Sequence, residues 1–321
     1  MTRNSIVLLA AAVSAFGSTV VQAQPYPAKP IRVVIPFSTG GATDTPGRAL
    51  VEYVSKTSPY KAFVDNRPGA GSTVGAAAVA SAAPDGYTLL ITATTHVIGA
   101  HLYKTLPYHA INDFAPIMQI AVAPSVLVVH PSLPVRSVKE LVSLAKARPD
   151  DIDFASSGMG TAQHVFCEMF QMLSGTKLRH IPYQGGRPVI DVISGRVQVW
   201  IPGMALALPH IQAKRLRPLG TTGAERSKGL PEVPTIAEAG VPGYEANLWA
   251  GVLAPTGTST EIISRLHGEM AKALKTPDVE KRFIGSGNEV VSTDPQRFGA
   301  LLRADYERWG KVVRQSGVTL N

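Results

Sequence analysis

The sequence predicts an α/β protein built of two lobes, and three observations lead to this prediction. The chain has 321 residues, 45% of them hydrophobic, and a length of about 300 residues usually divides into two domains. Short runs rich in Val, Ile and Leu alternate with stretches of helical periodicity, which indicates βαβ units. Two loops rich in glycine and hydroxyl side chains recur, as expected if each lobe supplies one side of a ligand site.

The first 23 residues have the pattern of a secretory signal peptide. Arg3 precedes the apolar run 6–13, small residues follow, and Ala23 suits a cleavage site. The apolar run is interrupted by Ser14 and is shorter than the roughly 20 residues that a membrane span needs. We therefore predict that residues 1–23 are removed and that the protein is exported to the periplasm.

The charge and cysteine content narrow the class of partner. The formal net charge is +8, from 31 basic and 23 acidic residues, and the basic residues are scattered, which disfavours nucleic acid and favours a small anionic ligand. Cys167 is the single cysteine, so an internal disulfide is impossible, and we expect a buried apolar residue rather than a reactive thiol. The absence of cysteine at the cleavage point argues for a freely diffusing protein, which we expect to be a monomer.

Apolar runs without polar alternation are typical of parallel strands that are buried on both faces. The chain has five such runs, and a further strand-like stretch covers residues 152–155. The five runs are residues 31–36, 89–93, 126–130, 197–201 and 251–254.

Three helices are predicted from capping signals and periodicity. Ser137 followed by Glu140 forms a capping box, and Pro149 ends the helix that it opens. Apolar side chains between residues 262 and 274 share one helical face. A second apolar face, from Phe298 to Val313, follows the start signal Asp294-Pro295.

The first glycine-rich loop follows the strand predicted at residues 31–36 and precedes a helix. Adjacent glycines at such a turn let backbone N–H groups approach an anion beside the positive end of the helix dipole. The loop is neither a Walker A loop nor a dinucleotide fingerprint, because it lacks both spacings, and an ordinary turn remains an alternative. Asp44 is expected to hold the loop as a cap rather than to touch ligand. Candidate ligand residues here are Phe37, Ser38, Thr39, Gly40 and Gly41.

The second loop repeats this chemistry after the strand-like stretch at residues 152–155. Two such loops, one on each lobe, could clamp a carboxylate between two helix N-termini by neutral donors. Candidate ligand residues here are Ser156, Ser157, Gly158, Gly160 and Thr161.

Signatures of catalysis and of metal binding are missing from the sequence. It contains neither a G-x-S-x-G elbow nor an H-E-x-x-H motif. The eight histidines are dispersed. We therefore expect no enzyme activity, no cofactor and no metal site.

The chain resembles the tripartite tricarboxylate transporter receptors, the Bug-type periplasmic solute-binding proteins. The resemblance runs from residue 26 to residue 313, and the order and spacing of its short motifs make it specific. The motifs are Tyr26-Pro27, Asn66-Arg67-Pro68-Gly69-Ala70-Gly71, Ala83-Pro84-Asp85-Gly86-Tyr87, Pro182-Tyr183-Gln184-Gly185, Leu208-Pro209-His210-Ile211 and Val233-Pro234-Thr235.

This resemblance implies a type II periplasmic-binding-protein fold, in which two α/β lobes are joined by crossover strands and enclose a ligand cleft. Lobe 1 would comprise residues 24–122 and 236–321, and lobe 2 residues 123–235. The two loops would hold the proximal carboxylate. Two further contact regions are implied, one near residues 92–96, with Thr94 and His96, and the other near residues 183–187, with Tyr183 and Arg187.

Two departures from the family pattern bear on the ligand. Pro202 stands where amino-acid-binding members often carry an acidic residue, so an α-amino ligand would lose its counter-charge. Arg187 stands where relatives more often have a small residue. It could bind a second, distal carboxylate bidentately, or it could be a solvated surface arginine.

The prediction is a receptor for a small carboxylate, favoured as a dicarboxylate if Arg187 contacts ligand. Phe37, Trp200, Met204 and Trp249 would leave room for an aromatic spacer such as that of terephthalate, although each could instead belong to the core. The expected partners are the membrane permease subunits of a tripartite tricarboxylate-type transporter. The alternative is a ligand-sensing partner of a membrane histidine kinase.

Overall fold

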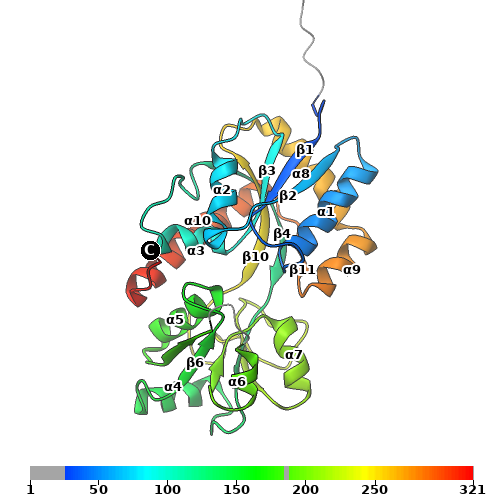
Figure 1. The fold of residues 1–321 in the computed structure, drawn as a ribbon. Helices are drawn as coiled ribbons and strands as arrows, with labels where there is room; N and C mark the ends of the chain where they lie inside the picture. Colours follow the sequence, from blue (N-terminus) through cyan, green and yellow to red (C-terminus); the bar gives the residue numbers. More distant parts are fainter. Residues whose placement is uncertain (1–25, 184–187, 321) are drawn as a thin grey trace, which may run out of the picture.

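The computed structural model describes residues 26–183 and 188–320, which form two α/β lobes, one above the other in Figure 1. The chain leaves lobe 1 through β4 (Phe114–Ala123) and returns through β10 (Leu248–Pro255). These two strands lie side by side at the crossing, where Leu248 pairs with Ala123. The predicted fold of two α/β lobes joined by crossover strands is therefore confirmed. The predicted signal peptide lies outside the described residues.

Lobe 1 has a six-stranded sheet covered by helices on both faces. The strand order is β11-β4-β10-β3-β1-β2, with β1, β2 and β3 parallel to one another. Helices α1, α8 and α9 share one apolar core with the sheet, and α2, α3 and α10 share another on the opposite face (Figure 1). The other elements of this lobe are β1 (Ile31–Ile35), α1 (Asp44–Thr57), β2 (Ala62–Asn66), the short 3-10 helix η1 (Ala70–Ser72), α2 (Thr73–Ala80), β3 (Thr88–Ala93), α3 (Thr95–Leu102), α8 (Thr260–Leu274), α9 (Pro277–Gly285), β11 (Glu289–Val290) and α10 (Pro295–Ser316).

Lobe 2 is built in the same way on a five-stranded sheet. The order is β7-β6-β8-β5-β9, and β6 lies parallel to both β7 and β8. Its elements are β5 (Val126–Val129), α4 (Val138–Ala147), β6 (Asp153–Ser156), α5 (Ala162–Ser174), β7 (Arg179–Pro182), α6 (Val189–Ile193), β8 (Val199–Trp200), α7 (Met204–Gln212) and β9 (Arg217–Thr221).

Two of the five predicted strands run in the opposite direction to the one expected. The run at 251–254 belongs to β10, which is antiparallel to β3 and β4, and the run at 126–130 forms β5, which is antiparallel to β8 and β9. Both strands adjoin the crossings between lobes. A strand that is buried on both faces has the same composition in either direction, so the apolar runs could not show this reversal.

The return to lobe 1 comes later than residue 236. Ile236 N donates to Thr221 O (2.9 Å), and Ala246 N donates to Thr222 O (2.9 Å). Tyr244 is buried and its hydroxyl donates to Phe166 O in α5 (3.1 Å). Residues 236–246 therefore stay with lobe 2, and the first sheet resumes at Leu248.

Two predicted helix N-termini, at Ser137 and at Asp294, are confirmed. Ser137 Oγ accepts from Glu140 N (3.2 Å), and Asp294 Oδ1 accepts from Arg297 N (2.8 Å). Cys167 is also buried as expected, and this burial raises the pKa of its thiol.

The two lobes also touch through their helices. The rings of Phe166 on α5 and Trp309 on α10 are stacked with centroids 5.3 Å apart. Figure 1 shows the C-terminal end of α10 reaching down beside α5. This apolar contact lies at one side of the gap between the lobes.

Candidate functional site

The gap between the lobes is where the loops that follow the parallel strands meet. In lobe 1 the parallel strands β1, β2 and β3 lead into α1, η1 and α3. In lobe 2 the parallel strands β6 and β8 lead into α5 and α7. Carboxyl ends of parallel strands share one edge of a sheet, and ligands of open α/β sheets bind at this edge.

The lobe 1 loop, residues 36–43, is held by a buried carboxylate. Asp44 is 1% exposed and accepts from Gly40 N (2.9 Å), Arg48 Nη2 (3.0 Å) and Asn66 Nδ2 (2.7 Å). Burial by itself raises the pKa of Asp44, but these hydrogen bonds and the Arg48 charge together hold it below its ordinary value. Asp44 thus stabilises the loop as expected, while the side chains of Ser38 and Thr39 are exposed.

The lobe 2 loop, residues 156–161, is held by its own polar groups. Thr161 Oγ1 donates to Gly158 O (2.8 Å), and Ser157 N donates to Gln163 Oε1 (3.1 Å). Gly158 and Gly160 have φ values of +138° and +70°, which other residues rarely adopt. A side chain at Gly160 would also meet Leu102 and Leu320 of lobe 1 at 2.9 Å, so this loop lies directly against lobe 1.

Three predicted ligand residues make hydrogen bonds inside lobe 1, although the buried Nδ1 of His96 has no partner among the described residues. Thr94 Oγ1 accepts from Trp249 N (2.8 Å), which ties α3 to the crossing strand β10. Trp249 Nε1 donates to the buried Asp305 (2.7 Å). His96 bonds to Ala110 O (2.9 Å), and burial lowers its pKa to about 4. The structure does not bring these three side chains to the gap.

The remaining candidates in lobe 2 are dispersed. Tyr183 donates to Asp191 (2.7 Å), and burial together with this bond raises its pKa to about 12. Pro202 is buried, and its carbonyl accepts from Val126 N beside the crossing (3.1 Å). Trp200 and Met204 belong to the core of lobe 2. Arg187 lies outside the described residues.

Three hydroxyl side chains are the strongest polar feature of lobe 1. The sequence analysis missed Ser72, whereas Thr92 and Thr95 lie within the contact region that the resemblance implied at residues 92–96. Ser72, Thr92 and Thr95 each have a buried Oγ without a hydrogen-bond partner among the described residues. Buried polar atoms without partners are rare in native proteins and point to a ligand or an ordered water. The available signal was the Asn66 to Gly71 segment, a third glycine-rich loop after a strand, which entered only as part of the resemblance.

Two adjoining cavities, here called the cleft, are lined by two of these residues. One cavity, about 260 Å³, lies between the lobe 1 loop and η1 and is lined by Ser38, Ser72 and Thr95. The other, about 270 Å³, lies between the lobes and is lined by Thr95, Gly160 and Thr161. They share Gly71 and Thr95, and their described lining contains no charged side chain. The cleft therefore offers neutral donors from both lobes.

Helix N-termini differ between the gap and the outer surface. Among the described helices, α4, α8 and α10 have side-chain N-caps, from Ser137, Ser259 and Asp294. The helices that follow the parallel strands, α1, α2, α3, α5 and α7, have none. The outer helix α9 also lacks a cap, although its first residue is proline, which has no N–H. Uncapped first-turn N–H groups are ready donors for an anion.

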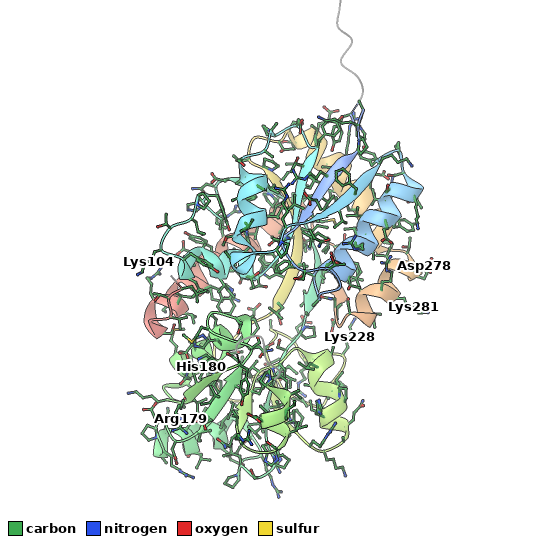
Figure 2. The ribbon with its side chains drawn as sticks, viewed as in Figure 1. Lys104, Arg179, His180, Lys228, Asp278 and Lys281 are labelled. Carbon is green, nitrogen blue, oxygen red and sulfur yellow. The ribbon has the colours of Figure 1, made fainter. Side chains whose placement is uncertain are left out.

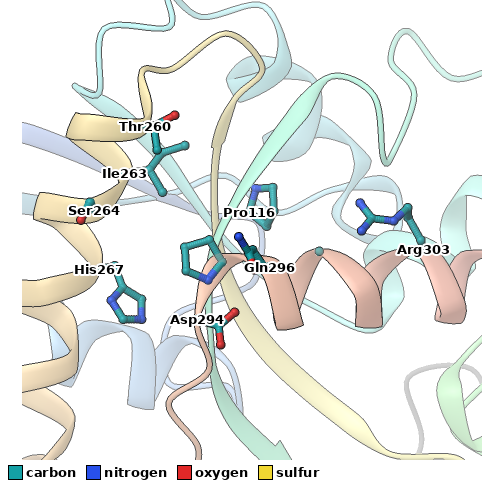
Figure 3. Close-up of a pocket in the computed structure, with 10 residues that line it drawn as sticks. Pro116, Thr260, Ile263, Ser264, His267, Asp294, Gln296 and Arg303 are labelled. Carbon is teal, nitrogen blue, oxygen red and sulfur yellow. The ribbon is translucent and has the colours of Figure 1, made fainter.

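A larger cavity on lobe 1, about 710 Å³, lies away from the two loops. Figure 3 shows it between α8 and the start of α10, with His267 and Asp294 on its wall. Asp294 caps α10, and His267 Nε2 bonds to Thr293 O (3.1 Å). These polar groups serve the local fold, so volume alone does not make this cavity the ligand site.

Two classes of site can be assessed over residues 26–183 and 188–320, metal centres and membrane-spanning helices. Within these ranges, three or more His, Cys, Asp or Glu side chains nowhere gather as a metal site would require. None of the helices there has the length and apolar character needed to cross a membrane.

Comparison with known sequences identifies close relatives over most of the chain. Residues 47–318 match the model of the tripartite tricarboxylate transporter family receptor. A protein from the tcbD-tcbE intergenic region of Pseudomonas sp. strain P51 is 37% identical, covering 92% of this chain and 89% of its own. Protein BugT of Bordetella pertussis is 36% identical, covering 94% and 93%.

Solved structures with the same fold include ligand-bound and ligand-free proteins. Rpa4515 of R. palustris with adipate has a TM-score of 0.74 at 35% identity, covering 92% of this chain and 99% of its own. MatC of Rhodopseudomonas palustris with bound malate has a TM-score of 0.72 at 29% identity, covering 90% and 100%. A solute-binding protein from Polaromonas without ligand has a TM-score of 0.83 at 25% identity, covering 90% and 99%.

Proposed function

Because this chain belongs to the tripartite tricarboxylate transporter receptor family, we propose that it binds a small dicarboxylate in the cleft and delivers it to membrane permease subunits. Receptors of this family are periplasmic solute-binding proteins and not enzymes. The proposal for this chain concerns the ligand, the residues that bind it and the partner that receives it.

The observation that carries the proposal is the set of unsatisfied neutral donors at the cleft. Ser72 and Thr95 line it with buried hydroxyls that lack partners, and Thr92 adds a third nearby on β3. The uncapped helices α1, α3 and α5 begin around the same space. A carboxylate has two oxygens that accept such donors, and neutral donors bind it without the desolvation cost of a buried cation.

A second carboxylate on the ligand is supported by two relatives and by one residue. Adipate in Rpa4515 and malate in MatC are both dicarboxylates. Arg187 is the proposed contact for the distal carboxylate, since a guanidinium binds a carboxylate through two parallel hydrogen bonds. An aromatic spacer, as in terephthalate, is part of the proposal. Pro202 disfavours amino acids, because it supplies no counter-charge for an ammonium group.

Hinged closure of the lobes would complete the site. The ligand-free Polaromonas structure superposes better than the adipate-bound structure, although its sequence is less similar. This order is expected if the present structure is open and the bound relatives are closed. Ligand that contacts both lobes would shift the equilibrium toward closure.

Export and delivery complete the proposal. We expect cleavage after residue 23, a monomer in the periplasm, and handover to a permease. We favour delivery to a permease over a role as the ligand-sensing partner of a membrane histidine kinase, because the receptors of this family serve transporters. Neighbouring permease genes would support transport, and a neighbouring sensor kinase would support the alternative.

The test is a thermal-shift screen followed by calorimetry on the purified protein. The panel contains adipate, malate, citrate, terephthalate, benzoate, aspartate and glutamate. A ligand at 100 times its Kd stabilises the native state by about 2.7 kcal/mol. Stabilisation by dicarboxylates is expected. Selective binding of aspartate or glutamate would contradict the inference from Pro202, and absence of any carboxylate binding would refute the proposal.

A further inference from the structure

A stacked pair of histidines lies behind the lobe 2 loop. His164 on α5 and His180 on β7 have ring centroids 3.8 Å apart and planes inclined by 10°, and the ring of Phe154 lies beside them, with its centroid 4.6 Å from His180 and 6.1 Å from His164. The parallel register places Phe154 opposite His180. Figure 2 shows His180 in the half of lobe 2 nearest lobe 1.

Each ring holds one end of the loop. His164 Nδ1 accepts from Gly160 N (3.1 Å), which leaves its proton on Nε2, where it faces Glu168 Oε1 at 3.4 Å. Ser156 Oγ lies 2.6 Å from His180 Nε2 and donates to Gly158 O (3.0 Å), so His180 donates through Nε2–H. Gly158 N in turn donates to Ser156 Oγ (3.1 Å).

These contacts use up the loop N–H groups of Gly158 and Gly160, and they fix the turn before α5. The N–H groups left for a ligand are those of Met159 and of the uncapped first turn of α5. Their direction depends on how the loop enters the helix. Neither imidazole lines the cleft, so neither is a ligand contact itself.

We propose that His164 and His180 are positioning residues for ligand binding: as an uncharged stacked pair, they hold the lobe 2 loop in the shape that presents the N-terminus of α5 to a carboxylate. The identity of the carboxylate rests on the proposed function, whereas the shape of the loop does not.

The surroundings of His180 favour its uncharged form. Burial, and then the neighbouring His164, lower the pKa of His180 to about 4. Glu168 is the acidic group beside His164. Asp153 and Arg179 form an ion pair with each other at 2.6 Å. They precede Phe154 and His180 in their strands, so their side chains project to the opposite face of the sheet from the histidine rings. A proton on His164 Nδ1 would remove the acceptor for Gly160 N.

The experiment uses variants that remove or restore each hydrogen bond. His180→Ala, Ser156→Ala and the double variant test one end of the loop, and His180→Gln restores the donor with its amide. At the other end, His164→Leu removes the acceptor and His164→Asn restores it. His130→Gln is the matched control, since His130 bonds within its own turn to Ser132 (2.7 Å).

The Kd for adipate and the urea midpoint are measured for each variant. We expect roughly tenfold weaker adipate binding for His180→Ala and for Ser156→Ala, with no further loss in the double variant. His180→Gln and His130→Gln should stay within about twofold of the parent. Additive losses in the double variant, or lowered stability without lowered affinity, would refute the positioning role.

A second readout needs no ligand. The backbone amide resonance of Gly160 in the ligand-free protein should move in His164→Leu and return in His164→Asn. An unmoved resonance in His164→Leu would overturn the proposal, even if adipate does not bind. Failure of adipate binding with the expected resonance shifts would instead count against the proposed ligand alone.

Discussion

The two glycine-rich loops that border the cleft are held by different chemistry. In lobe 1 a buried charge, Asp44, gathers Gly40 N, Arg48 and Asn66. In lobe 2 neutral groups, Ser156 and the pair of His164 and His180, do the equivalent work. Both arrangements leave helix N-termini without side-chain caps.

The difference shows that a loop can be kept rigid for anion binding without placing a free charge beside the anion. The Asp44 charge is matched by Arg48 at 3.0 Å, and burial lowers the pKa of His180, which keeps that ring neutral. The stability of the lobe 1 loop should therefore be sensitive to removal of the Asp44 carboxylate, and that of the lobe 2 loop to protonation of His180.

The largest effect is expected from Asp44→Ala. It leaves Arg48 and Asn66 without their shared acceptor, and breaking a buried pair of this kind costs about 3 kcal/mol of unfolding free energy. Urea denaturation measures this loss. Asp151→Ala is the control, because its pair with Arg148 is exposed on both sides and should contribute under about 1 kcal/mol. Equal losses would show that Asp44 does not hold the loop.

The next effect is the loss of unfolding free energy in acid, to which one histidine of each lobe contributes. The folded protein keeps His96 and His180 neutral with pKa values of about 4, whereas unfolded histidine titrates at 6.5. The unfolded chain binds more protons between these values, so stability present above pH 6.5 falls by about 3 kcal/mol for each histidine as the pH drops to about 4. The stability that the lowered pKa of Asp44 contributes is present above pH 3.8 and is lost only as the pH falls below this value.

Urea denaturation at steps from pH 7.5 to 4.5 measures this slope. The decrease in unfolding free energy per pH unit should become smaller in His180→Gln and should be the same as in the parent in Asp151→Ala. A slope that is identical in His180→Gln would mean that the lobe 2 pair does not titrate in this window.

Ser72→Ala tests whether the orphan hydroxyls belong to ligand binding rather than to the loop anchors. Removing a buried hydroxyl without a partner should leave the stability of the free protein unchanged or raise it by about 1 kcal/mol. Binding of the best dicarboxylate should weaken by roughly tenfold, measured by calorimetry. Thr258→Val is the control, because that hydroxyl donates to Pro255 O (2.8 Å) far from the cleft. Unchanged affinity in Ser72→Ala would remove this hydroxyl from the site.

The smallest effect is expected from adding a cap at the gap. Gly203 precedes α7, has ordinary negative φ, and has open space where a Cβ would stand. Gly203→Asp should raise stability by about 0.5 kcal/mol and weaken carboxylate binding by charge repulsion, whereas the neutral cap in Gly203→Ser should spare affinity. Asp294→Ala, at an outer helix, should cost about 1 kcal/mol and leave affinity unchanged. Equal affinities for the Asp and Ser variants would place α7 away from the ligand.

Local patterns in the sequence determined the elements that local physics controls. The caps at Ser137 and Asp294, the burial of Cys167 and the strand–loop–helix units were all predictable, because they depend on neighbours within a few residues. The glycine-rich loops were found for the same reason. The strand directions of β5 and β10 were not, because periodicity does not encode the partner strand.

The tertiary structure alone decided which groups are free to bind. Thr94 and Thr95 are adjacent in sequence, yet Thr94 pins β10 while Thr95 lacks a partner, because packing against the crossing strand satisfies only one hydroxyl. The stacking of His164 on His180 likewise arises where α5 crosses β7, between residues 16 positions apart. The sequence by itself determined that two glycine-rich loops begin helices, whereas hydrogen bonds between distant segments decided which donors remain for a ligand.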